Sequence, residues 1–192
     1  MKQNLKKKTL IAKKLTTALL LLFFLFIASG CSKTITNITP SNKAFPSVKG
    51  DSLDGKLVNI PEDLKGAPAI LLVGYTQKTQ FDIDRWILGL KQIKSQAKIL
   101  ELPTIPGLLP GLAADFISNG MKRGIPREDW PSVVTVFSDG DKIMNVTGNE
   151  NPNNARVFLL DNSGNIAWFY DRGYSADQIM NLEESFQKLS KN

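Results

Sequence analysis

Hydrophobic positions in the chain follow two spacings, and together these spacings predict an α/β protein. The short continuous apolar run 69–73 predicts a strand that is covered on both faces. Further strands are predicted at 98–102, 133–137, 157–160 and 166–170. The last two runs flank a turn through Asp161-Asn162-Ser163-Gly164 and form the clearest hairpin. A weaker hairpin is predicted around Asp54-Gly55.

Three stretches have helical spacing. The first begins at Phe81 and ends near Ser95, and its apolar side is either Phe81, Trp86, Ile87, Leu90 and Ile93 or Ile83, Ile87 and Leu90. The others are 111–122, capped by Gly124, and 176–189, with Ser175 as N-cap. The piece 142–154 is poorly periodic and is predicted to be a connection.

The first thirty residues have a character of their own. Six lysines and no acidic residue accompany an apolar run from Ala18 to Ala28, well short of the ~20 residues that span a bilayer. The run closes with Ala28-Ser29-Gly30-Cys31, which resembles the lipobox of bacterial lipoproteins. That resemblance implies a removed signal peptide over 1–30 and an acylated, palmitate-bearing Cys31. The alternative is an ordinary signal peptide with an incidental cysteine.

The first thirty residues change both the net charge expected for the mature chain and its expected location. The chain has 24 basic and 18 acidic residues, and without the first thirty it has 18 of each. The basic excess therefore belongs to the export signal, and nucleic acid is not an expected partner. The expected partners are the membrane, through the lipid on Cys31, and another envelope protein. Ser32 resembles the sorting pattern for the outer membrane, facing the periplasm, if the host is diderm.

Cysteine and histidine counts remove whole classes of mechanism. Cys31 is the only cysteine and histidine is absent. Dithiol exchange, Cys-His and Ser-His-Asp nucleophiles, and zinc sites built on His and Cys are therefore excluded. We expect no cofactor and no metal, and any enzymatic activity would rest on carboxylate chemistry.

The segment 31–47 is polar and reads as a lipidated tether before one domain over 48–192. In this domain, SLDGKLVNIPEDLKGAPAILLVGY and ARVFLLDNSGNIAWFYDRGYS are similar to the opening and the final hairpin of thioredoxin-like proteins. The resemblance implies a central mixed sheet flanked by helices, with a C-terminal hairpin and helix.

Two departures from that superfamily concern its reaction. The redox pair falls at about Thr79 to Asp82, where neither end is cysteine. The proline that faces the redox loop is missing from Asn153-Asn154-Ala155-Arg156, and Pro152 lies too far upstream. The chain is more similar to the mitochondrial ATP-synthase assembly-factor family, because a polar loop, a Trp-containing helix and the TGNENP segment at 147–152 recur there. That likeness implies a membrane-associated assembly role.

The loop after the 69–73 strand lies where the superfamily binds substrates. A partner or ligand surface is predicted there from Tyr75, Gln77, Lys78, Asp82, Asp84 and Arg85. The alternative is a solvated loop whose acidic residues serve the helix dipole. A second hypothesis is an envelope enzyme with Asp82, Asp84, Arg85 or Glu101 near one cleft, although Asp82 and Asp84 diverge by ~200° on a helix. The apolar, proline-rich stretch 101–112 is either a partner surface or packs across the sheet.

Overall fold

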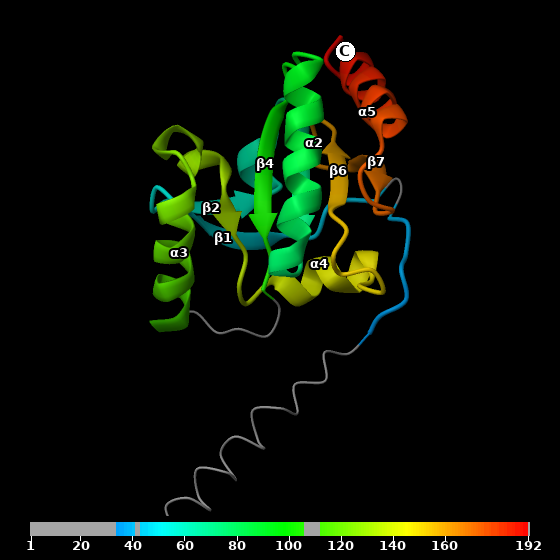
Figure 1. Cartoon of the computed structure of the whole chain (residues 1–192). Coiled ribbons are helices and arrows are strands. Elements are labelled where there is room, and N and C mark those ends of the chain that lie inside the picture. Colours follow the sequence, from blue (N-terminus) through cyan, green and yellow to red (C-terminus); the bar gives the residue numbers. More distant parts are fainter. Residues whose placement is uncertain (1–33, 41–42, 106–111, 192) are drawn as a thin grey trace, which may run out of the picture. The chain divides into compact units, whose positions relative to one another are not determined.

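The apolar runs of the sequence form the centre of the computed structural model (Figure 1), which describes residues 34–40, 43–105 and 112–191. The expected signal peptide, Cys31 and half of the proline-rich stretch, residues 106–111, lie outside the described residues. Within the described chain, a compact unit begins at Thr34.

The main sheet has four strands in the order β4-β3-β6-β7. Its central strand β3 (Ala69–Gly74) is buried along its whole length, as its continuous apolar sequence predicts. β4 (Lys98–Pro103) runs parallel to β3, whereas β6 (Arg156–Leu160) pairs with its other edge in antiparallel register. β7 (Ile166–Tyr170) completes the predicted hairpin.

Three shorter strands form a second sheet, in the order β2-β1-β5. β1 (Val48–Ser52) and β2 (Leu57–Ile60) form the weaker predicted hairpin, and Gly55 in its turn has a φ of 91°. β5 is only Val134–Thr135, shorter than the predicted strand, but parallel bridges such as Thr104 to Val136 connect its neighbourhood to β4.

Helices α2 (Gln80–Gln92) and α5 (Ala176–Leu189) cover one face of the main sheet. Ser175 caps α5 as predicted, because its hydroxyl accepts from the Gln178 amide at 3.4 Å. The buried face of α2 matches neither of the two predicted apolar faces in full, because it combines Ile83 from one with Trp86 from the other, together with the shared Leu90. Phe81 lies outside it.

The opposite face of the sheet is covered by the β1–β2 hairpin and by α4 (Gly140–Thr147). We expected no helix at α4, because the sequence from 142 on is poorly periodic and predicts a connection. Burial of Ile143 in the core decides the conformation instead. α3 (Leu112–Gly124) agrees with the predicted helix. No helix in the described ranges is long and apolar enough to cross a membrane.

Residues 34–40, which we call the strap, differ from the expected tether. Ile35 and Asn149 exchange two hydrogen bonds, with the Ile35 amide donating to Asn149 Oδ1 at 2.6 Å and the Asn149 amide donating to the Ile35 carbonyl at 2.8 Å. The Ile38 amide donates to the Thr147 carbonyl at 2.9 Å. Further on, Phe45 is buried in the core. The polar composition predicted a free segment, but these bonds hold it against the domain.

Candidate functional site

The candidate site begins where β3 ends. After Gly74 the chain enters a 3-10 turn, Gln77–Thr79, which leads directly into α2. The Thr76 amide donates to Thr79 Oγ1 at 3.3 Å, and the two hydroxyls are 3.2 Å apart. These two threonines therefore close the turn from within.

The two positions at which thioredoxin-like proteins carry their redox pair are buried and bonded here. Thr79 is 0% exposed, and its hydroxyl donates to the Pro152 carbonyl at 2.7 Å. Asp82 is 3% exposed, and its carboxylate accepts from the backbone amides of Ala155 at 2.9 Å and Tyr174 at 2.8 Å. Both side chains join α2 to other segments, so neither presents a reactive group to solvent.

The loop is backed by a buried arginine. Arg156 is 0% exposed, and its Nη1 donates to the carbonyls of Asn151 at 2.6 Å and Asn154 at 2.8 Å. Its guanidinium lies 4.9 Å from the centre of the Tyr75 ring. Burial raises the pKa of Tyr75 to about 12, and the phenol bonds to the Thr147 hydroxyl at 2.7 Å. Tyr75 is thus a neutral structural group and not an acid or base near neutral pH.

The segment around Pro152 faces the loop after β3. Pro152 lies opposite the loop through its carbonyl group, which accepts from Thr79. Within the described ranges, the cis peptide bond is Ile60–Pro61, which follows β2 and does not precede β6. The segment that faces the loop therefore contacts it through hydrogen bonds.

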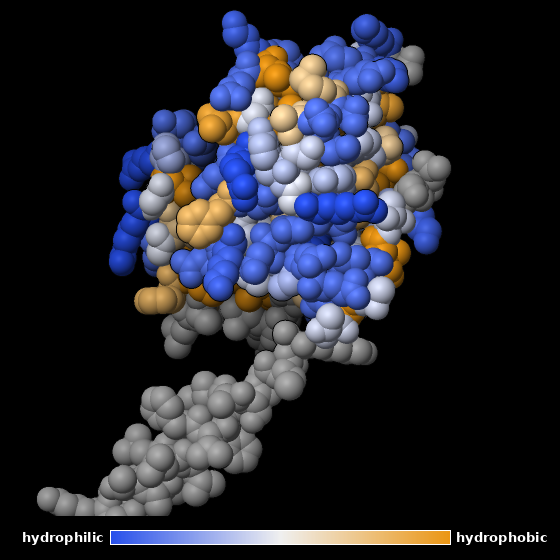
Figure 2. Space-filling model, turned by 45° about the vertical axis from the view of Figure 1, so that its right-hand side comes forward, coloured by the Kyte–Doolittle hydropathy of each residue, from blue (hydrophilic) through white to orange (hydrophobic). Residues whose placement is uncertain are grey.

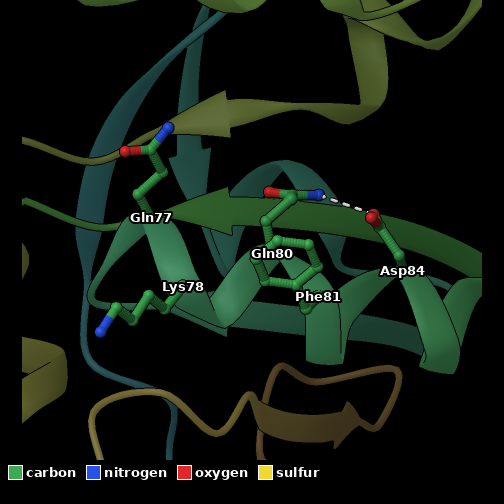
Figure 3. A pocket seen from close by; sticks show the side chains of 5 residues that line it. All are labelled: Gln77, Lys78, Gln80, Phe81 and Asp84. Atoms are coloured by element: carbon green, nitrogen blue, oxygen red, sulfur yellow. Dashed lines mark hydrogen bonds between the residues drawn. The ribbon is translucent and has the colours of Figure 1, made fainter.

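A shallow hollow of about 370 Å³ lies beside the turn, lined by Gln77, Lys78, Gln80, Phe81 and Asp84 (Figure 3). Phe81 is 74% exposed, although it stands at the start of a buried helix. Gln80 Nε2 donates to Asp84 Oδ1 at 2.9 Å, while Lys78 extends in the opposite direction. The hollow therefore offers an aromatic ring between polar groups of both signs.

Glu101 lies behind this region, on β4. It is 7% exposed, and its Oε1 has no hydrogen-bond partner among the described residues. Burial raises the pKa of Glu101, the Gln80 amide opposes that shift, and the negative charges of Asp84 and Asp129 add to it. Glu101 is thus the one buried acidic group near the hollow whose ionisation is disfavoured.

The structure divides the residues predicted for this surface into three sets. Tyr75 and Asp82 are used internally. Gln77, Lys78 and Asp84 line the hollow. Arg85 does not line the hollow. Its Nη2 lies 3.6 Å from Asp82 Oδ1, and its guanidinium lies 5.9 Å from the centre of the Tyr174 ring.

The four groups of the enzyme hypothesis therefore do not meet at one point. Asp84 lies near Glu101, whereas Asp82 and Arg85 lie on the side of Tyr174. Across the described ranges, no group of three or more acidic residues is arranged to hold a metal ion.

Sequence reasoning missed Phe81 and Arg156. Phe81 fitted one of two apolar faces, and only the helix phase set by packing turns it outward. Leu88, two turns further along α2, is also exposed, at 57%. On the face seen in Figure 2, hydrophilic side chains predominate and hydrophobic ones form small separate groups. Of the exposed residues Phe81, Leu88 and Phe116, Phe81 is the one that lines the hollow.

Comparison with known proteins identifies the architecture. BsSco, of the Sco family of cytochrome c oxidase assembly proteins, aligns with a TM-score of 0.52 at 14% identity, over 78% of this chain and 97% of its own. A thiol peroxidase from Chromobacterium violaceum gives 0.53 at 11% identity, over 81% and 92%. The domain has a thioredoxin-like fold.

A third similar structure is the exposed lipoprotein thioredoxin of Streptococcus pneumoniae strain TIGR4, with a TM-score of 0.50 at 14% identity, over 72% of this chain and 98% of that one. No protein-family model and no curated protein matches the sequence. Identities this low establish the fold alone, and activity has to be argued from the site.

Proposed function

We propose that this protein is a lipid-anchored, redox-inactive thioredoxin-like lipoprotein of the cell envelope that binds another envelope protein and assists its assembly. The observation that carries this proposal is the state of Thr79 and Asp82. In the superfamily these positions perform thiol chemistry, and here they are buried and bonded internally.

The anchor and the binding role have separate support. The sequence before Cys31 has the order of charge, apolar run and small residues found in lipoprotein signals. A neighbour with the same fold is a lipoprotein, and another belongs to a family of assembly proteins. The exposed Phe81 ring in the hollow supplies the kind of aromatic anchor that dominates protein interfaces.

Paired variants test the binding role. Phe81→Ala removes the ring in the hollow, whereas Leu88→Ala removes an exposed apolar side chain of the same helix away from it. After crosslinking in cells, we expect the parent and Leu88→Ala to retain one partner that Phe81→Ala loses. Identical adducts from both variants would contradict this site. In the same preparation we expect no turnover in an insulin-reduction assay.

A second function, hydrolysis or proton transfer by carboxylates, has one observation in its favour, the buried Glu101 with its raised pKa beside Asp84. Separation of Asp82 and Arg85 from this pair leaves the hypothesis with two acidic groups, Asp84 and Glu101. Screening of ester, glycoside and phosphate substrates tests it. Activity that disappears in both Glu101→Gln and Asp84→Asn would favour the enzyme, and a binding role would then be secondary.

A further inference from the structure

The strap places the folded domain close to its attachment point. Only Ser32 and Lys33 separate Cys31 from Thr34, where the compact unit begins. Three residues span at most ~11 Å when fully extended. A free segment reaching Ser47 would instead allow a span of ~55 Å. Because the strap is hydrogen-bonded to the domain, the shorter limit applies.

The strap is bonded to the segment that also holds residues 75–79, the loop after β3, which we call the candidate loop. Asn37 and Glu150 exchange two hydrogen bonds of 3.0 Å, with each backbone amide donating to the other side chain. Two residues further along, the Pro152 carbonyl accepts from Thr79, and Asn153 Oδ1 accepts from the Thr76 hydroxyl at 3.1 Å. The strap, residues 149–153 and the candidate loop therefore form one continuous set of contacts.

The strap and the end of α5 lie at different ends of the unit. The strap leads toward the end of the unit that carries α4 and the first turn of α2, whereas α5 ends at the opposite end (Figure 1). A folded unit of this length has a radius of gyration of ~15 Å. A lipid attached within ~11 Å of Thr34 would therefore lie nearer the end of the unit that carries the first turn of α2, into which the candidate loop leads, than the end of α5.

We propose that the strap presents Gln77, Lys78 and Phe81 to the membrane surface, and that their partner is a water-exposed segment of an integral membrane protein. This inference rests on the lipid anchor of the proposed function. Lipid headgroups are a poorer match, because the hollow combines Lys78 with Asp84 and has Glu101 and Asp129 nearby, whereas anionic lipids select clusters of basic residues. The exposed aromatic ring fits an apolar side chain of a protein segment.

Quenching by headgroup-labelled lipid measures this arrangement. The full chain, purified with its lipid, carries a fluorophore on either Lys78→Cys or Lys188→Cys, two exposed lysines near opposite ends of the unit, and is placed in phosphatidylcholine–phosphatidylglycerol vesicles. We expect quenching at position 78 to exceed that at 188 several-fold. Equal quenching at the two positions would overturn the inference.

A linker variant shows whether the strap is responsible. About thirty Gly and Ser residues between Lys33 and Thr34 add a mean span of ~30 Å without touching the fold. We expect the two positions to become nearly equal in quenching, and an unchanged ratio would refute the role of the strap. A chain that never sediments with vesicles would refute the anchor itself, which is a different result.

Photo-crosslinking from Gln77 identifies the class of partner. We expect an adduct with an integral membrane protein, formed by the parent chain and lost on linker insertion. An adduct with phospholipid would overturn the choice of a protein partner, and so would a protein adduct that persists with the long linker.

Discussion

Single side chains at this site connect segments where the superfamily performs chemistry. Asp82 shows this most clearly, because its carboxylate serves two backbone amides that are far apart in sequence. Its sequence neighbour Asp84, also acidic and on the same helix, is exposed. Their different environments follow from helix geometry, since residues two apart point to different sides. The same residue type therefore has a structural role at one position and a surface role at the other.

Replacing Asp82 tests that structural role. In Asp82→Ala two backbone amides lose their acceptor, and each unsatisfied buried donor costs ~1–3 kcal/mol. We expect a loss of about 2–4 kcal/mol in the free energy of unfolding, measured by urea titration of residues 34–192. Asp84→Ala is the matched control and should change it by less than ~0.5 kcal/mol. Similar losses in the two variants would contradict the assignment.

Glu101 gives the site a pH dependence. Burial, its largest influence, raises the pKa of Glu101 above the ordinary value of 4.5, so the folded chain holds this proton more tightly than the unfolded chain. Stability therefore falls as the pH rises from about the ordinary value through the raised pKa, and the full loss remains above it. Glu101→Gln should be more stable than the parent above this window and no more stable below it.

Denaturant titrations across that pH range measure the difference. Glu128→Gln, a change of the same type at an exposed residue, is the control and should follow the parent. A Glu101→Gln curve that is parallel to the parent curve at every pH would show that this carboxyl does not contribute.

At the scale of elements, the sequence predicted the strands and helices whose conformation is set by residues close together in the chain. The continuous apolar run predicted β3. The turn that begins at Asp161 predicted the β6–β7 hairpin, and the N-cap Ser175 predicted the start of α5. Asp161 Oδ1 does accept from the amides of Ser163 and Asn165, both at 2.8 Å. α4, the strap and the outward Phe81 depend on contacts with distant residues, which periodicity does not record.

The strap and α4 meet at a glycine, and this contact is testable. Gly148 has a φ of 73°, and a Cβ there would overlap the Thr36 carbonyl oxygen. Gly148→Ala therefore adds a backbone clash to the strain of a positive φ, and we expect a loss of about 2–4 kcal/mol together with fast hydrogen exchange at the amides of Ile35 and Ile38.

Gly66→Ala isolates the strain. Gly66 has a φ of 98° with open space around its Cβ position, so this variant should lose only ~1 kcal/mol and leave exchange in the strap unchanged. If both variants exchange alike at Ile35 and Ile38, the strap is not held by this contact.

At the scale of the whole molecule, a thioredoxin-like fold carries a loop after β3 whose Thr79 side chain is buried, followed by the buried Asp82 in α2. The mixed sheet, α2 and α5 keep the superfamily architecture, and the loop after β3 stays at the position of the redox site. Threonine, aspartate and arginine now fix that loop internally, while Gln77, Lys78 and Phe81 remain outside. The proposed binding role rests on this arrangement, in which the loop is fixed from inside and these three side chains face outward.

The most direct test of this account places a photo-reactive amino acid at Phe81 or at Leu88 in otherwise unchanged cells. Both positions are exposed on α2, at 74% and 57%, and only Phe81 lines the hollow. The account predicts a discrete protein adduct from position 81 and none from position 88. Adducts of equal yield and identity from both positions, or none from either, would contradict the claim that the loop after β3 is a binding surface.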